Sequence, residues 1–291
     1  MYIRPAHAEL DIPTLHAFIR EHALGLFTTA ITHATHPTIQ TSHIPFVLDR
    51  PAPPSPSPNA DASEPATKPP LGVLRGHMAR ANPQAKALID HLKSRGAESA
   101  SASASSSSGF LSSWLGSSAS ASTTDARPTP GPSSLSDEVL VLFNAPEHSY
   151  ITPKWYTETK PLTGKVVPTW NYAAVQVYGR ARIYYEQDDA TASFLQTQVE
   201  DLSRLQEELA GHERPWEVAD APTSYVDALK KAIIGIEIEI TRCEGRFKLS
   251  QEMGDGDWKG VVQGFKALET DKAKKLAGMV QERGKQRGVD S

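Results

Sequence analysis

The segment covering residues 76–84 carries residue types that could bind a phosphate group. It reads Gly-His-Met-Ala-Arg-Ala-Asn-Pro-Gln and joins an apolar, strand-like run to a helical pattern. The first turn of a helix presents unpaired backbone N–H groups and the positive end of the helix dipole. Arg80, just before that turn, could add a bidentate contact to phosphate oxygens. A phosphate site at this turn is therefore chemically reasonable; local chemistry alone favours the alternative, in which Asn82 is an ordinary helix cap and Arg80 a surface residue.

A second segment, residues 165–175, places polar and aromatic residues together at the start of a predicted strand. Thr169, Trp170, Asn171 and Tyr172 follow one another there. Side chains alternate along a strand, so Thr169 and Asn171 should face one side, with Trp170 and Tyr172 on the other. One pair could hydrogen-bond a polar heterocycle while the other packs in the core or at a subunit interface. The simpler alternative is a strand start with aromatic core residues.

A third segment, residues 149–156, is rich in turn-forming and aromatic residues. Tyr150, Trp155 and Tyr156 could stack on a planar ligand, or they could hold a loop against the rest of the fold. The ten histidines show no metal-binding spacing, and no Ser-His-Asp order, Walker loop or Rossmann glycine pattern is present. No catalytic residue or metal ligand is therefore predicted.

Composition and charge narrow the function classes. The formal net charge of −4 and the isoelectric point near 6.2 oppose a general affinity for nucleic acid. The single cysteine, Cys243, excludes an internal disulfide or a cysteine zinc site, and a buried or half-buried structural role is expected for it. The first residues do not resemble a signal peptide, and no apolar run approaches the ~20 residues that span a bilayer. We therefore predict a cytoplasmic protein without membrane contact, the nucleus remaining an alternative.

Two stretches interrupt the folded pattern. Residues 51–70 are mostly Pro, Ala, Ser and Asp, and residues 96–136 are dominated by Ser and Ala and then by Pro, Thr and Gly. Neither offers enough apolar surface to offset the entropy of ordering, so both are predicted to be disordered inserts. An apolar island at residues 110–115 lies inside the second. The remainder, residues 1–50, 71–95 and 137–264, is expected to form one discontinuous domain, followed by a charged helical tail at 265–291.

The elements expected around these inserts are mostly strands with helices between them. Helices are predicted from Asp11 and Asn82 onward and at residues 190–209, 223–233 and 258–283. Strands are predicted at 24–32, 38–48, 71–78 and 138–143, with a long strand or hairpin at 166–185 and a hairpin at 234–251 turning at Glu244 and Gly245. Without a regular βαβ repeat, this order predicts an α+β fold: a mainly antiparallel β-barrel with flanking helices.

Taken together, these segments resemble the PaiB family, a family of transcriptional regulators with an FMN-binding split-barrel fold. The resemblance runs in order from the first residue to about residue 264 and skips the two inserts. It is carried by residues 1–3, 18–21, 43–46, 76–84, 149–156, 165–174, 215–216, 235–238 and 248–251. In the family the last of these motifs usually reads Trp-Lys-Leu-Ser-Gln, and here Phe247 replaces the tryptophan while Lys248 is kept.

The resemblance implies a homodimer that holds FMN in clefts at the subunit interface, with the flavin phosphate on the strand-to-helix turn. The residues implied as cofactor-binding are His77, Met78, Ala79, Arg80, Asn82, Thr169, Asn171 and Lys248. It also implies a flavin-dependent oxidoreductase or flavin-binding protein. A transcriptional regulator, like the bacterial members that control protease production and sporulation, is the alternative, although no helix-turn-helix is evident and direct binding of nucleic acid is not expected. A haem-binding or haem-degrading split barrel ranks third, since no strong haem ligand is visible.

Overall fold

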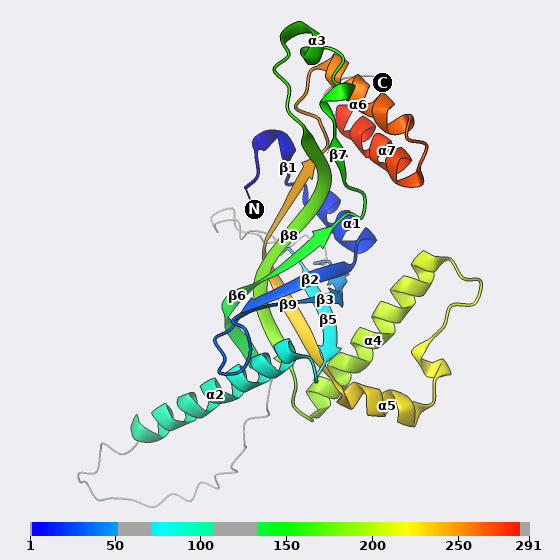
Figure 1. Cartoon of the computed structure of the whole chain (residues 1–291). Coiled ribbons are helices and arrows are strands. Elements are labelled where there is room, and N and C mark those ends of the chain that lie inside the picture. Colours follow the sequence, from blue (N-terminus) through cyan, green and yellow to red (C-terminus); the bar gives the residue numbers. More distant parts are fainter. Residues whose placement is uncertain (1, 52–70, 107–132, 286–291) are drawn as a thin grey trace, which may run out of the picture.

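The computed structural model of the protein describes residues 2–51, 71–106 and 133–285. Figure 1 shows a long curved sheet with helices gathered at its two ends. Most of the two predicted inserts, including the apolar island at 110–115, lies outside the described residues. The second insert was expected to span residues 96–136. Within that range the structure has helix α2, Pro83–Ser106, and strand β6, which begins at Ser133 and pairs with β8. Leu135 of β6 belongs to the hydrophobic core.

One antiparallel sheet forms the body of the protein. Along the sheet the order is β3-β2-β6-β8-β9-β5-β4, with β1 added to β9 and β7 to β8. The strands are β1 (Ala8–Glu9), β2 (Leu24–Ala30), β3 (Ile39–Pro45), β4 (Val47–Asp49), β5 (Val73–Ala79), β6 (Ser133–Asn144), β7 (Ser149–Ile151), β8 (Thr169–Tyr184) and β9 (Ile233–Lys248).

The sheet curls into a split barrel because of how its two ends are connected. The path through the sheet begins at β3 and ends at β4, and only Phe46 separates these strands in the chain. One bent segment therefore pairs with β2 through its first half and with β5 through its second half. Within the described residues β3 and β4 share no ladder, so the barrel is not fully closed. The predicted α+β fold with a mainly antiparallel split barrel is confirmed.

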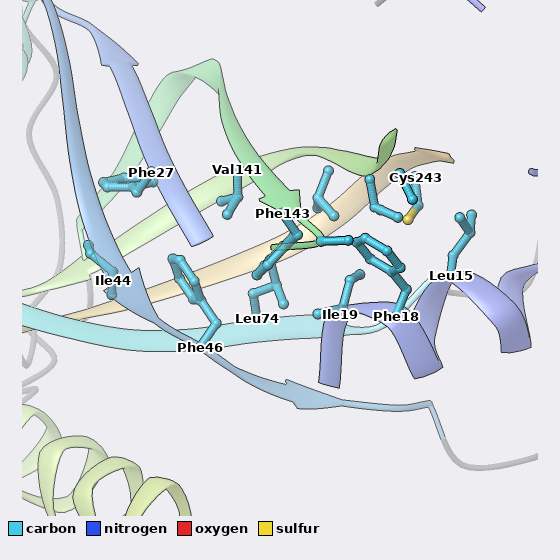
Figure 2. Close-up of a cluster of buried hydrophobic side chains, with 14 of the residues drawn as sticks. Leu15, Phe18, Ile19, Phe27, Ile44, Phe46, Leu74, Val141, Phe143 and Cys243 are labelled. Carbon is cyan, nitrogen blue, oxygen red and sulfur yellow. The ribbon is translucent and has the colours of Figure 1, made fainter. Parts of the chain in front are cut away.

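The barrel is filled by side chains from alternate strand positions. Figure 2 shows Phe27, Phe46 and Phe143 meeting inside it, and the ring centroids of Phe46 and Phe143 lie 6.1 Å apart. Helix α1 (Ile12–Glu21) closes one end with Leu15, Phe18 and Ile19. Such burial of large apolar side chains is the main favourable contribution to folding.

Helix α1 begins where the sequence predicts it. The carboxylate of Asp11 accepts a hydrogen bond from the Thr14 backbone N–H at 2.9 Å, so Asp11 is the N-cap. Cys243 lies on the sheet beneath this helix and is buried, as expected, which raises the pKa of its thiol to about 12.

Strand β9 differs from the hairpin predicted around Glu244 and Gly245. It is one strand of 16 residues that pairs with β8 along its length. Gly245 makes no turn: a Cβ there would lie 2.6 Å from the Leu15 side chain and 2.9 Å from Glu9 Cβ. The glycine serves the close approach of helix α1 to the sheet, which local sequence does not reveal. The hairpin prediction was wrong for this reason. Residues 169–184 likewise form a single strand, β8.

A C-terminal pair of helices, α6 (Asp255–Lys266) and α7 (Asp271–Lys285), replaces the single helix predicted at 258–283. The chain turns at Glu269, whose φ is +55°. Trp258 is fully buried between the two helices and donates its indole N–H to the Val280 carbonyl at 3.2 Å. The pair packs against the 3-10 turn Pro153–Trp155, with the Trp155 and Phe265 rings 5.0 Å apart.

A second pair of helices, α4 (Asp189–Ala210) and α5 (Thr223–Lys231), lies at the other end of β8 and β9 (Figure 1). The first half of α4 packs on the sheet through Thr191, Leu195 and Gln198. From residue 199 to residue 232 no residue is buried. We call residues 199–232 the arm; it includes the 3-10 turn Val218–Asp220. The remaining short helices are α3 (Thr159–Thr163) and the turn Pro5–His7. Within the described residues, none of the helices has the length and apolar character of a membrane-crossing segment.

Candidate functional site

The turn from β5 into α2 places the first group of predicted site residues. Asn82 caps α2: its side-chain oxygen accepts from the Gln84 backbone N–H at 2.8 Å, and its amide donates to the Ser42 hydroxyl at 3.0 Å. Met78 points into the core, while Ala79 is exposed. The turn is therefore held rigidly at the start of the helix, with its backbone near the surface.

Arg80 is tied to the end of β8 but keeps donor capacity. Its Nη2 donates to the Tyr185 carbonyl at 2.7 Å, and its backbone N–H donates to the Ala232 carbonyl at 2.8 Å. Its Nε is buried and lacks a hydrogen-bond partner among the described residues. A buried donor without a partner is costly, so a ligand or water acceptor is expected there.

His77 faces helix α4 rather than the turn. Gly235, its pairing partner on β9, lies against the Phe194 ring, and Arg75, two residues before His77, donates to Asp201 at 2.7 Å. Gln198 lies between Phe194 and Asp201 on the same face of α4 and is fully buried, with neither end of its amide partnered within the described part of the chain. Burial lowers the pKa of His77. The histidine thus belongs to a polar layer beneath α4.

Gln84 is a residue of this turn that the sequence did not single out. It is 1% exposed, and its amide donates to the Phe27 carbonyl at 3.1 Å and to the Thr29 hydroxyl at 3.0 Å. A third acceptor is the Gln40 carbonyl at 3.2 Å. These bonds fix the start of α2 to β2 and β3. A polar residue directly after Asn-Pro was the available signal, because buried amides at helix starts often bond neighbouring backbone.

A cavity of about 310 Å³ adjoins Arg80 on the side of helices α4 and α5. Its charged lining is mixed: besides Arg80 it comprises Glu186, Asp188, Asp189, Asp227, Lys230 and Lys231. Four carboxylates would repel a phosphate placed there. An anion would be better accommodated at the first turn of α2, where unpaired backbone N–H groups and the helix dipole favour it.

The second group of predicted site residues surrounds Lys248. Its ammonium donates to the Thr169 hydroxyl at 2.5 Å and to the Trp170 carbonyl at 3.0 Å. Desolvation by burial lowers the pKa of Lys248, and Glu252, 3.8 Å away, acts in the opposite direction. The result is a half-buried cation held in one place by the start of β8.

Asn171 has a structural partner. It is fully buried, and its amide and the hydroxyl of the fully buried Ser250 are 3.0 Å apart. Ser250 has a φ of +62°, so this contact fixes an unusual backbone turn at the end of β9. The predicted alternation is confirmed, because Asn171 is inside while 47% of Trp170 is exposed.

An aromatic cleft of about 910 Å³ opens beside Trp170. The Trp170 indole donates to His148 Nδ1 at 3.2 Å, and the two rings stack at 5.9 Å. Tyr172 and His22, at the end of α1, also line it. His148 and His22 were not predicted, because neither stands in a motif and only the fold brings them to Trp170. The volume and the aromatic lining are typical of small-molecule sites.

The two groups lie at opposite ends of the molecule. Ala79 pairs with Ile233 at the start of β9, and Tyr172 pairs with Lys248 at its end. A strand rises about 3.3 Å per residue, so about 50 Å of strand β9, which has 16 residues, lies between these positions. Within one chain, no small ligand can touch both Arg80 and Lys248.

Comparison with known proteins shows the family to which the chain belongs. Residues 1–242 match the family model described as "Putative FMN-binding domain". An uncharacterized protein of Emericella nidulans is 49% identical over 288 residues, 98% of each chain. The Bacillus subtilis protein named protease synthase and sporulation protein PAI 2 is 28% identical over 148 residues, 50% of this chain and 64% of its own. Among solved structures, the conserved hypothetical protein Rv2991 of Mycobacterium tuberculosis aligns over 87% of this chain and 94% of its own, with 10% identity and a TM-score of 0.41.

Proposed function

Since the chain belongs to this FMN-binding domain family, which includes the PaiB-type split barrels, we propose that it binds FMN as a flavoprotein whose site is shared between two copies. The observation that carries the shared site is the separation of Arg80 from Lys248 along β9. Each lies in a half-buried setting suited to part of a flavin nucleotide, and only a second copy can bring the two parts together. A two-fold axis would create two equivalent sites.

Arg80 and the first turn of α2 would hold the phosphate. The buried Nε of Arg80 is a donor in need of an acceptor, and the backbone turn before Pro83 lies at the positive end of the helix dipole. His77 and Met78 would support this turn from behind, through the layer beneath α4 and through the barrel core.

Lys248 and the aromatic cleft of the other copy would hold the flavin ring. The ammonium, positioned by Thr169 and the Trp170 carbonyl, would bind the carbonyl edge of the ring. Trp170 and Tyr172 would shield one face from water. FMN supplies the redox chemistry when it is bound, and these side chains orient it and set the charge around it. A flavin-dependent oxidoreductase is the activity that this arrangement favours, with a substrate entering the aromatic cleft.

The phosphate contact is tested by comparing two ligands. For Arg80→Ala, FMN affinity should fall about tenfold to a hundredfold, because a charge-assisted contact is worth roughly 1.5–3 kcal/mol. Riboflavin has no phosphate, so its affinity should not change. Arg95→Ala, an exposed arginine further along α2, is the matched control. Equal losses for both ligands would mean that Arg80 supports the fold instead. The absorbance spectrum of the purified protein also separates a flavin from a haem.

The shared site is tested by mixing two defective chains. Arg80→Ala and Lys248→Met should each bind FMN poorly alone. In a two-copy site, a mixed dimer carries one site with both changes and one site with neither, so about a quarter of the sites should regain full affinity after random mixing. No recovery after mixing, with dimers verified by light scattering, would place the whole site in one chain and refute the proposal.

A further inference from the structure

The arm is an ordered helical segment without a core of its own. No residue from 199 to 232 is buried, and helix α5 has none at all. Yet the arm displays large apolar side chains: Leu209, Trp216, Tyr225 and Leu229 are 67%, 46%, 58% and 50% exposed. Short helices in water owe their stability to the packing of an apolar face. An exposed apolar set of this kind marks an interaction surface.

The charge of the arm defines the partner. Over its whole length, residues 199–232, the arm carries eight acidic and four basic side chains. Six of the acidic ones lie between residues 207 and 227: Glu207, Glu208, Glu213, Glu217, Asp220 and Asp227. This excess of negative charge opposes nucleic acid and anionic lipid, and it favours a basic surface with some apolar area.

The outward side of the C-terminal helix pair is such a surface. Helix α7 buries Ala273, Leu276, Ala277 and Val280, which leaves its lysines outside. The helix pair, residues 255–285, carries seven basic and five acidic side chains; Arg283 is turned inward onto Glu9, and Asp257 is buried. Lys266 and Lys272 are exposed without an ion pair among the described residues, and Leu268 beside them is 51% exposed. Figure 1 shows α5 and the start of α4 at one end of the sheet and α6–α7 at the other, while the end of α4 passes α1 and lines the cleft beside Trp170 with Leu202 and Gln206. Within the described part of one chain, no ion pair joins Lys266 or Lys272 to the arm.

We infer that the arm of one copy docks on the α6–α7 surface of a second copy. A two-fold axis that brings the β5–α2 turn of one chain to Lys248 of the other exchanges the two ends of the sheet. Helix α5 adjoins Arg80 at the β5–α2 end, and α6–α7 adjoin the Lys248 end, so the same axis brings the α5 side of each arm toward α6–α7 of the other copy. This pairing geometry rests on the proposed flavin site, whereas the unburied arm and the opposite charges stand independently of it.

The experiment is a charge swap between two variants of the full-length chain. One variant carries Glu208→Lys, Glu213→Lys and Asp227→Lys in the arm, and the other carries Lys266→Glu, Lys272→Glu and Lys274→Glu. All six positions are exposed, so both variants should fold, which circular dichroism and the melting temperature verify. Glu207 and Lys275 are left unchanged because their side chains bond the Trp216 backbone and Glu147. Glu208, Asp227 and Lys274 each belong to an ion pair at the surface of their own helix, and such pairs contribute little to stability.

Each variant alone should dimerise at least about 100-fold more weakly than the unchanged chain, because like charges then meet in both contacts. Mixed together, the two variants should form heterodimers with near-normal affinity, since reversed arm meets reversed helix and normal arm meets normal helix. Sedimentation velocity with one variant fluorescently labelled measures this. Dimerisation of the unchanged chain should also weaken with added salt.

Two results would overturn the inference: variants that dimerise as well as the unchanged chain, or an unchanged chain that stays monomeric at every concentration. The latter would point to a different basic protein as the partner of the arm. The inference and the flavin proposal can fail separately. Heterodimers of the charge-swapped chains without FMN recovery in the Arg80 and Lys248 mixture would keep the interface and refute the shared flavin site. FMN recovery in the Arg80 and Lys248 mixture, together with normal dimerisation of each charge-reversed variant, would support the shared flavin site and refute the docking of the arm.

Discussion

The two helix pairs are attached to the same long ladder, and they differ in what they bury. The α6–α7 pair surrounds Trp258, which is fully buried, whereas α4 and α5 beyond residue 198 bury nothing. The α6–α7 pair is basic outside and complete within one chain. The arm is acidic and incomplete. The difference shows that regular helical structure does not by itself indicate where stability resides: the first pair stabilises its own chain, and the second offers its surface to another.

The most direct test of this difference is to replace the tryptophan of each helix pair by alanine and to compare the losses of stability. Trp258→Ala should lower the free energy of unfolding by about 3–5 kcal/mol, because it leaves a cavity and removes the hydrogen bond to Val280. Trp216→Ala in the arm should change it by less than about 0.5 kcal/mol. Urea denaturation at a protein concentration too low for dimers measures both. A comparable loss at Trp216 would show that the arm packs on its own chain.

Two glycines of α7 test, within one helix, whether one face is packed and the other is free. A Cβ on Gly284 would overlap the Trp258 ring, while a Cβ on Gly278 would meet nothing within 4 Å. Gly284→Ala should therefore destabilise by about 1–3 kcal/mol. Gly278→Ala should stabilise by roughly 0.5–1 kcal/mol, because alanine favours the helix. If both changes lower the melting temperature alike, α7 does not pack as described.

The attachment of α4 depends on a charged contact. Arg75 bonds Asp49 of β4 and Asp201 of α4, and its side chain is 11% exposed. Arg75→Met should cost roughly 1–3 kcal/mol, since two carboxylates lose their partner. It should also speed hydrogen exchange in the second half of α4. Arg204→Met is the matched control: its side chain is 58% exposed, and the expected change is within about 0.5 kcal/mol. Equal exchange rates in the two variants would argue against a clamp at Arg75.

The smallest effect concerns protons beneath α4. Burial lowers the pKa of His77, and the same cause lowers the pKa of His16 and His22. Just below pH 6.5 these histidines are therefore protonated in the unfolded chain but still neutral in the folded chain. The free energy of unfolding should be highest above about pH 6.5 and should decrease as the pH falls below that value. In His77→Gln the number of protons taken up on unfolding should decrease by up to about one. If His77→Gln takes up as many protons on unfolding as the unchanged chain, the prediction for His77 is wrong.

Local patterns predicted the elements well wherever local chemistry decides them. Asp11 and Asn82 cap helices as expected, because a cap is made within three residues of itself. The alternation of Ile234, Ile236 and Ile238 in β9 was also readable. Gly245 was misread as a turn because its purpose, space for Leu15, depends on a helix more than 200 residues earlier in the chain.

The candidate site shows the same limit more strongly. The chemistry of Arg80 and of Lys248 could be read from their segments, but the separation between them follows from the register of β9 against β5 and β8. Register depends on side-chain packing across the whole barrel, which no single motif contains. Nor could the sequence distinguish a helix that packs from one that does not, since α5 and α7 are both amphipathic.

Cys243 can serve as a chemical probe of how often the barrel opens. Its thiol is buried and, at a pKa of about 12, almost wholly protonated near neutral pH, so an added thiol reagent can modify it only in molecules that have opened. The labelling rate of this single cysteine therefore counts opening events under the layer that α1 forms over the sheet. At low reagent concentration the rate reports the equilibrium between closed and open barrels, and at high concentration it reports how often the barrel opens. The labelling rate of Cys243 thus reports how the barrel opens, a property that the contacts of the closed structure do not give.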